Sequence, residues 1–319
     1  MKAVLLGVVS LLLLAGCADD SFYSGDDTGV VDSGSVEDPF GPIPDYGPNR
    51  DAMQCRDSID LVFVLDVSSS MGFVLDKLAS EIDKVVTASN KLAPDSHFGL
   101  VAFVDNHRLD TTGPAEGGKV HLDAATLSAA FKQVKATYTQ PNRNPGDGPT
   151  GPTLQNPICE ENASDALYAA ADEFPWRTNA NRVIIVATDD TFLERPDNYG
   201  DRDGDGKTDK TDYPREGDYP ALRILSETVD ILRTTKVRVF AFTRLKPPGL
   251  LDPTRCGTGR RLPWTAVSDG WSTPYGGQNP IPAATGGKNF DLDQVHAGTL
   301  SLTETINNMV LDSHCKPIE

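Results

Sequence analysis

The sequence predicts an α/β domain whose mainly parallel sheet is covered by helices on both faces, in the manner of a doubly wound fold. Segments of strand and helix character alternate along residues 55–319, which is typical of such sheets. Residues 59–65 form a largely apolar run of strand length, as expected for a central strand buried on both faces. Apolar residues then recur at helical spacing, namely Leu75, Leu78, Ile82, Val85, Val86 and Leu92.

The later segments continue the alternation. Further strands are predicted at residues 98–104, 183–187 and 237–242, with short ones at 120–122 and 288–292. Four more helices are predicted from apolar residues at helical spacing: Leu127, Phe131 and Val134; Ala163, Ala166, Leu167, Ala170, Ala171 and Phe174; Leu222, Leu225, Val229 and Leu232; Leu302, Ile306 and Val310.

The first seventeen residues have the features of a lipoprotein signal peptide. Lys2 supplies a positive start, residues 4–14 are apolar, and Leu14-Ala15-Gly16-Cys17 forms a lipobox. The apolar run is about half of the roughly 20 residues that a membrane-spanning helix needs. Resemblance to bacterial lipoproteins implies that Cys17 carries acyl chains and becomes the mature N-terminus.

Residues 18–54 are rich in Asp, Gly, Ser and Pro and poor in large apolar residues, so we expect a disordered acidic tether. Coil statistics give about 35 residues a mean reach of roughly 30 Å. Ala18, rather than an aspartate, follows the lipidated cysteine, and by resemblance this favours the bacterial outer membrane and its surface. Asp19 and Asp20 keep the inner membrane open as an alternative.

The formal net charge of −17 argues against nucleic acid as a partner, because phosphate binding needs the opposite sign. Four cysteines remain besides Cys17, and an even number in an exported chain suggests two disulfides. They allow three pairings. A Cys55–Cys315 bridge would join the two ends of the domain, since these residues flank its first strand and last helix, and would leave Cys159 with Cys256.

Ligands of open parallel sheets bind at the carboxyl ends of the strands. The strand at 59–65 ends in Asp66, Ser68 and Ser70, and the strand at 183–187 is followed by Asp189. Carboxylate and hydroxyl oxygens suit a small hard cation such as Mg²⁺. Serine and aspartate before a helix are also ordinary capping residues, which is the simpler alternative for an isolated D-x-S-x-S pattern.

Residues 60–71, DLVFVLDVSSSM, resemble the metal-ion-dependent adhesion site that opens a von Willebrand factor A domain. The resemblance spans nearly all of residues 58–312. Its further segments, at 98–105, 161–169, 176–177, 182–189, 218–220 and 239–243, follow the order of integrin β I-like domains, and 284–292 is similar to the closing strand of many A domains.

This resemblance implies a site for Mg²⁺ or Mn²⁺ in which Ser68 and Ser70 bind directly, Asp66 binds through water, and Asp189 closes the site. Glu161 stands where most A domains have a threonine and integrin β chains have a glutamate, with Thr153 as an alternative ligand. Glu161 could instead be a favourable charge at a helix N-terminus.

The two auxiliary metal sites of integrin β chains are poorly matched. Phe73 and Val74 replace the aspartates of one, and the other keeps only Asn156, with Ile158 and Glu160 departing from its pattern. A single central metal is therefore expected.

An inserted loop at residues 198–217 resembles an EF-hand or dockerin calcium loop, with Gly206 at the sharp turn. Position twelve is an aspartate rather than the usual glutamate, which predicts modest Ca²⁺ affinity. A solvated acidic loop is the alternative. The expected ligands are Asp201, Asp203, Asp205, the carbonyl of Lys207, Asp209 and Asp212.

No common catalytic or nucleotide-binding motif is present, so an enzyme is not expected. The resemblance instead implies a surface-anchored protein whose metal binds an exposed carboxylate of a protein or glycan partner. The lipid anchor would attach this protein to the membrane. The alternative is an envelope scaffold that uses the A domain to assemble other envelope proteins.

Overall fold

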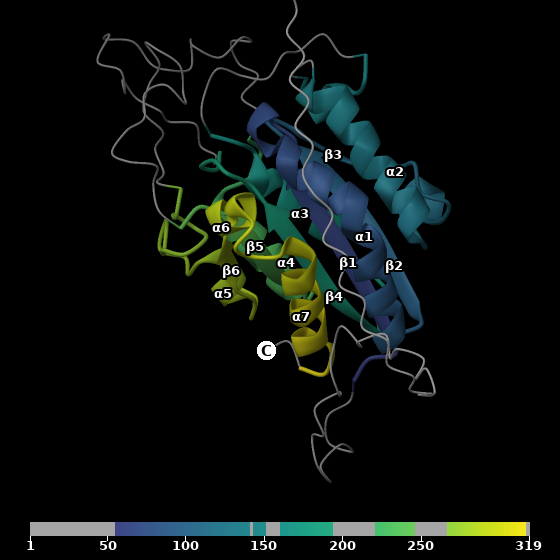
Figure 1. Cartoon of the computed structure of the whole chain (residues 1–319). Coiled ribbons are helices and arrows are strands. Elements are labelled where there is room, and N and C mark those ends of the chain that lie inside the picture. The colour runs from purple at the N-terminus through teal and green to yellow at the C-terminus, as the bar shows by residue number, and fades with distance from the viewer. Residues whose placement is uncertain (1–54, 141–142, 151–159, 194–220, 246–266, 317–319) are drawn as a thin grey trace, which may run out of the picture. The chain divides into compact units, whose positions relative to one another are not determined.

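The computed structural model describes residues 55–140, 143–150, 160–193, 221–245 and 267–316 (Figure 1). Within them lies a six-stranded sheet in the order β3-β2-β1-β4-β5-β6. Only β3 is antiparallel to its neighbour; the other pairings are parallel. The predicted α/β class is therefore confirmed. The strands are β1 (Ser58–Asp66), β2 (Asp95–Phe103), β3 (His107–Leu109), β4 (Ala180–Ala187), β5 (Arg238–Thr243) and β6 (Asn289–Asp291).

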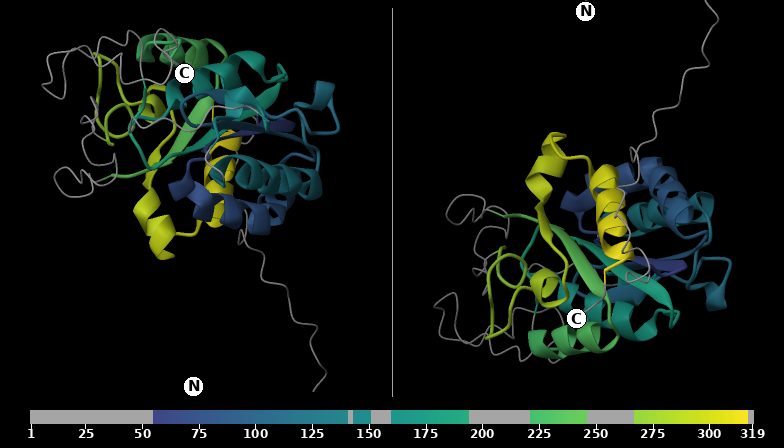
Figure 2. Two further views of the ribbon diagram at one scale, coloured as in Figure 1. Left: turned by 90° about the horizontal axis from the view of Figure 1, so that it is seen from above. Right: turned by 90° about the horizontal axis from the view of Figure 1, so that it is seen from below.

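Helices cover both faces of this sheet, which Figure 2 shows from two opposite ends. The longer helices on one face are α1 (Gly72–Leu92), α2 (Ala124–Val134) and α7 (Leu302–His314), and on the other α3 (Ala163–Glu173) and α4 (Leu225–Thr234). The short helices α5 (Ile281–Ala284) and α6 (Leu292–Ala297) flank β6 in the chain. No helix of the described residues is long and apolar enough to cross a membrane.

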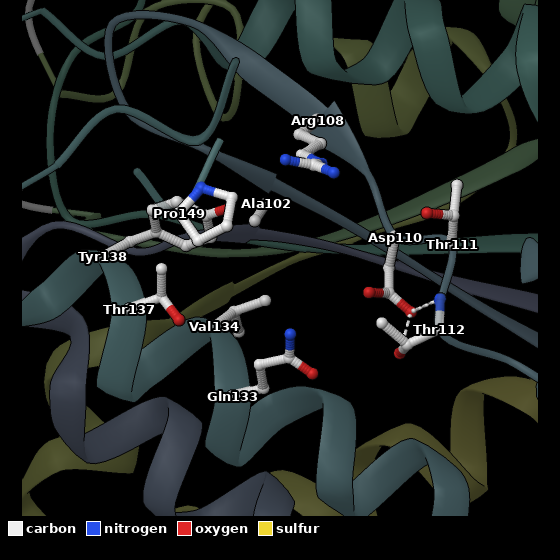
Figure 3. A pocket seen from close by; sticks show the side chains of 10 residues that line it. All are labelled: Ala102, Arg108, Asp110, Thr111, Thr112, Gln133, Val134, Thr137, Tyr138 and Pro149. Atoms are coloured by element: carbon white, nitrogen blue, oxygen red, sulfur yellow. Dashed lines mark hydrogen bonds between the residues drawn. The ribbon is translucent and has the colours of Figure 1, made fainter. Parts of the chain in front are cut away.

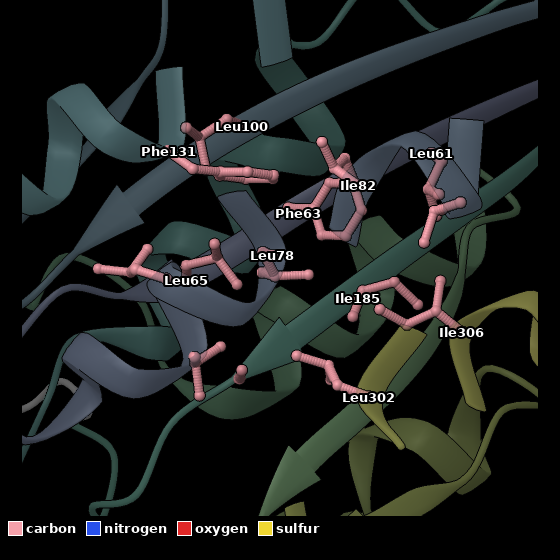
Figure 4. Packing of buried hydrophobic residues seen from close by; sticks show 14 of the residues in the cluster. Leu61, Phe63, Leu65, Leu78, Ile82, Leu100, Phe131, Ile185, Leu302 and Ile306 are labelled. Atoms are coloured by element: carbon pink, nitrogen blue, oxygen red, sulfur yellow. The ribbon is translucent and has the colours of Figure 1, made fainter. Parts of the chain in front are cut away.

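Strand β1 is the centre of the core. Leu61, Phe63 and Leu65 point to the face covered by α1, α2 and α7 (Figure 4), whereas Val62 and Val64 belong to the cluster on the α3 and α4 face. All five are 0–1% exposed. A strand that is buried on both faces cannot alternate apolar with polar residues, which explains its continuous run.

Two details of the expected elements were wrong. Residues 120–122 form no strand: Val120 and His121 make isolated bridges, and Leu122 is 45% exposed. The edge strand is instead β3, which pairs with β2 after a short turn. Leu222 lies outside α4 and is 56% exposed, because the Ile224 N–H donates to the Glu227 carboxylate and the helix starts at Leu225.

Asp60 is a charged residue inside this apolar strand, and it is fully buried. Arg177 donates to it twice, from the backbone N–H to Oδ2 and from Nε to Oδ1, both at 2.7 Å. The same guanidinium reaches the carbonyl oxygens of Ile59 and Asp95. The pair therefore fastens the segment before β4 to the beginnings of β1 and β2.

Cys55 and Cys315 form a disulfide across 260 residues of sequence, so the predicted joining of the domain ends is confirmed. Cys17, Cys159 and Cys256 lie outside the described residues, as do the signal peptide and the tether.

Replacing Arg177 with alanine is expected to lower the free energy of unfolding at pH 7 by about 3–5 kcal/mol, because it leaves the buried Asp60 carboxylate unpaired. Burial already raises the pKa of Asp60, and losing Arg177 raises it further. The variant's deficit should be smaller at an acidic pH than at pH 7, because protonation of Asp60 removes the unpaired buried charge. Urea unfolding at both pH values measures this, and an equal deficit at both would contradict it.

The Cys55→Ser, Cys315→Ser double variant should lose about 2–5 kcal/mol of unfolding free energy. The bridge closes a long loop and so lowers the conformational entropy of the unfolded chain. Each single variant should lose a similar amount. Thermal and urea unfolding of all three test this, and unchanged midpoints would show that the bridge does not stabilise the domain.

Candidate functional site

The end of β1 and the loop after it present the first three predicted ligands. Asp66 is the last residue of β1 and is 1% exposed. Its Oδ1 accepts from the Ser68 backbone N–H at 2.7 Å, which folds the loop back over the strand end. The Oγ atoms of Ser68 and Ser70 lie 3.1 Å apart. One turn of chain thus gathers a carboxylate and two hydroxyls at the carboxyl edge of the sheet.

Strand β4 brings the fourth predicted residue to the same place. Asp189 lies two residues beyond the strand, and its Oδ1 accepts from Ser70 Oγ at 2.9 Å. The preceding Thr188 donates from Oγ1 to Asp66 Oδ2 at 2.9 Å. Thr188 was not among the predicted ligands, although its place beside Asp189 at a strand end could have suggested it. The two strand ends are therefore connected by hydrogen bonds in both directions.

Glu161 approaches from a third segment. It lies before the N-cap residue of α3, Asn162, rather than within the helix. Two hydrogen bonds join its backbone to the segment after β4, from its own N–H to Thr191 O and from Leu193 N–H to its carbonyl. Its side chain is buried, and Oε2 has no hydrogen-bond partner among the described residues. A buried carboxylate oxygen without a hydrogen-bond donor is unusual. A cation, or a water molecule bound to one, would satisfy this oxygen.

The carboxylates of the site raise one another's pKa values. Burial, and then the charge of Asp189, raises the pKa of Asp66 to about 7. Burial, followed by repulsion from Asp66 and Asp105, holds the pKa of Glu161 well above its usual range. Burial also raises the pKa values of Asp189 and Asp190. The cluster therefore resists being fully charged unless a cation balances it.

Arg244 is a neighbour of this cluster that no sequence pattern indicated. It follows β5, and its Nη2 lies 3.7 Å from Asp189 Oδ2. Its Nε also donates to Asp293 Oδ1 at 3.1 Å, near the start of α6. Because β5 pairs with β4 in parallel, the residue after β5 reaches the same edge as Asp189. Searching every strand end for charged residues, basic as well as acidic, could have found it.

The arrangement suits a small divalent cation only if hydroxyls and water contribute. Among the described residues, the Cys, His, Asp or Glu group whose ligand atoms all lie within 4.8 Å of one another is Cys55, His314 and Cys315, two of which form the disulfide. Asp66, Glu161 and Asp189 do not form so tight a group. Direct binding by Ser68 and Ser70, with waters between the ion and some carboxylates, fits these positions and the tendency of Mg²⁺ to keep waters.

The positions of the auxiliary sites are only partly described. Phe73 packs against the core, and the centre of its ring lies 4.4 Å from the centre of the His296 ring. Val74 is buried. Glu160 is also buried. Thr153, Asn156, Ile158 and the whole candidate calcium loop lie outside the described residues: Asp201, Asp203, Asp205, Lys207, Asp209 and Asp212.

A small cavity of about 60 Å³ lies between β3 and the end of α2 (Figure 3). Arg108, Gln133 and Tyr138 line it together with Asp110. Burial acts to raise the pKa of Asp110, but hydrogen bonds from His121 and Thr112 outweigh it and leave the pKa lowered. The cavity has room for a few water molecules. Since its acid is already paired, it is a weaker candidate for a ligand site than the strand-end cluster.

Comparisons with known proteins add little to this geometry. No family model matches the chain, and no curated protein matches it. Among solved structures, the chain is similar to the conserved hypothetical protein BatB from Bacteroides thetaiotaomicron, at 13% identity and a TM-score of 0.42, over 80% of this chain and 98% of that one. A likeness this distant carries no argument about function.

Without metal, the site should make stability depend on pH in a defined direction. The pKa of Asp66 is about 7 in the folded protein, against an ordinary value of 3.8. Between these values the folded state keeps a proton that the unfolded state releases, so ionisation of Asp66 opposes folding increasingly as pH rises to about 7. In a chelator, Asp66→Asn should therefore gain stability relative to wild type as pH rises from about 4 to 8.

Urea unfolding of both proteins at several pH values measures this difference. A difference that stays constant across the range would contradict the raised pKa. With saturating Mg²⁺ at pH 8, the wild type should instead be more stable than Asp66→Asn, because only the wild type retains all the acidic groups proposed to hold the metal.

Proposed function

We propose that the chain is a von Willebrand factor A-type binding protein that uses a divalent cation to hold an acidic group of a protein or glycan partner. One observation carries the proposal: Asp66, Ser68 and Ser70 of one loop and Asp189 of another meet in a continuous hydrogen-bonded set at the carboxyl edge of a parallel sheet. This is the edge at which open parallel sheets bind ligands.

The proposed metal holders are Ser68, Ser70, Asp66, Glu161 and Asp189. A bound Mg²⁺ or Mn²⁺ would supply an electrophilic position that accepts a carboxylate oxygen in place of water. The residues themselves prepare the site: Thr188 and the Ser68 N–H orient Asp66, and Asp189 orients Ser70. The unpartnered Oε2 of Glu161 supports its role, since a cation or its water would satisfy that atom.

The proposed setting is the bacterial outer membrane, with Cys17 lipidated, the tether extending the domain from the surface, and the protein acting in adhesion. An assembly role inside the envelope is the alternative. Protease treatment of intact cells separates the two, because a surface-displayed domain is cleaved and a shielded one is protected. Cys17→Ser should release the protein from the membrane fraction if the anchor is a lipid.

The loop at residues 198–217 is proposed to bind Ca²⁺ and order the chain near the site. Calorimetry of wild type and Asp203→Ala with Ca²⁺ tests it. The proposal requires binding that the variant weakens, and absence of binding to the wild type contradicts it.

The Ser68→Ala, Ser70→Ala variant should bind Mn²⁺ at least about tenfold more weakly than wild type, because two oxygen ligands are lost. It should also abolish attachment of cells that display the protein, as should a chelator. Titration calorimetry and a cell-attachment assay measure the two effects.

Ser80→Ala is the matched control, since Ser80 is an exposed serine whose Oγ donates only to carbonyls of its own helix, α1. Normal Mn²⁺ binding and attachment by the double variant would contradict the proposed site. Loss of metal binding with unchanged attachment would favour the scaffold alternative.

A further inference from the structure

Arg244 places a positive charge in the wall of the candidate metal site. Its side chain is 11% exposed and lies between two carboxylates, with Nη2 3.7 Å from Asp189 Oδ2 and Nε 3.1 Å from Asp293 Oδ1. These carboxylates differ in exposure, since Asp189 is 7% exposed and Asp293 52%. The Nη1 atom is buried and has no hydrogen-bond partner in the part of the chain that the structure describes. Arg244 is therefore held near the site without all of its donors being used.

The charge balance of the site gives this arginine a role. If Asp66, Glu161 and Asp189 are ionised, a divalent cation leaves the three with one excess negative charge. Such a site would repel a carboxylate, although a metal in a neutral or positive setting would attract it. Arg244 places a positive charge 3.7 Å from Asp189 Oδ2 and so offsets part of this excess. Its low exposure limits screening by solvent and salt, so the effect on an incoming acid is larger than for a surface residue.

We propose that Arg244 is the specificity-determining residue of this site: it makes the metal-loaded cluster accept an acidic group, at the expense of weaker metal binding. The inference rests on the proposed function. The same guanidinium repels the cation and partly neutralises Asp189, so it lowers the affinity for the metal. Once the metal is bound, the guanidinium raises the affinity for the carboxylate of the partner. Metal affinity and acid affinity should therefore respond to Arg244 with opposite signs.

A purely structural role would have a different result. Arg244 also connects the end of β5 to α6 through Asp293, and that ion pair could simply hold two segments together. In that case, removing either partner breaks the same contact and has the same consequence. The charge role predicts instead that Arg244→Gln and Asp293→Asn shift metal affinity in opposite directions, since one removes a positive charge and the other a negative charge near Asp189.

The first measurement is Mn²⁺ titration calorimetry on the purified full chain. Arg244→Gln should bind Mn²⁺ roughly threefold or more tightly than wild type, and Asp293→Asn should bind it more weakly, as partly buried charge interactions allow. Arg233→Gln is the matched control, because Arg233 is an exposed arginine at the end of α4 and its loss changes the net charge equally. Its Mn²⁺ affinity should equal that of wild type.

The second measurement uses an acidic probe, N-acetyl-aspartate amide, with N-acetyl-asparagine amide as its neutral control. Displacement of water from protein-bound Mn²⁺ is followed by water-proton relaxation. Wild type, Arg233→Gln and Asp293→Asn should bind the acidic probe, whereas Arg244→Gln should bind it at least roughly threefold more weakly. Arg244→Lys, which keeps the charge, should bind it nearly as well as wild type.

The proposal is overturned if Arg244→Gln and Asp293→Asn change Mn²⁺ affinity in the same direction, or if Arg244→Gln binds the acidic probe as well as wild type does. Either result leaves the metal site itself standing, because the wild type still binds both Mn²⁺ and the probe. Absence of Mn²⁺ binding to the wild type would instead overturn the proposed function and this inference together.

Discussion

The parallel pairing of β1 between β2 and β4 is the constraint on which the site depends. Its register places Leu65 opposite Ala187 and Asp66 opposite Phe103, so the chain leaves β1 and β4 at the same level and at the same edge. A shift by one residue would turn Asp66 toward the other face of the sheet. The Asp60–Arg177 pair and the side-chain packing of β1 on both faces hold this register, and through it the relative positions of Asp66, Ser70 and Asp189.

The stabilising contacts and the candidate binding site lie at opposite ends of the strands. Arg177 and Asp60 act near the start of β1, and Cys55 is joined there to the residue after α7. The carboxyl ends of the strands concentrate carboxylates whose pKa values burial raises, which is unfavourable for folding without a cation. Buried carboxylates with raised pKa values are common at functional sites, where they lower the free energy of unfolding. The Asp60–Arg177 pair and the disulfide at the other end of the sheet can offset this loss.

The sequence was sufficient for the fold class, the buried strands and the strand-end residues, because apolar runs and helical spacing directly reflect burial. It failed at 120–122 because a short apolar segment can be buried by isolated bridges as well as by a strand. It also failed at Leu222, where the Glu227 carboxylate, rather than the apolar pattern, determines the start of the helix. Local propensity does not contain either contact.

The arrangement of the candidate site residues could be predicted from the sequence only in part. Asp66, Ser68, Ser70 and Asp189 follow strands that the pattern reveals, so their meeting could be expected. The burial of Glu161 depends on backbone bonds to Thr191 and Leu193, and the position of Arg244 depends on the pairing of β4 with β5. Both depend on long-range contacts, which the local sequence pattern does not contain. These contacts bring the charges of Glu161 and Arg244 to the candidate site.

The most direct test of the central claim is a crystal structure of the protein soaked in Mn²⁺, with the metal located by its anomalous scattering. A metal at the proposed site would give a peak within bonding distance of Ser68 Oγ and Ser70 Oγ, surrounded by Asp66, Glu161 and Asp189, with a water or an acidic group at an open position. Absence of a peak there at saturating Mn²⁺ would contradict the central claim.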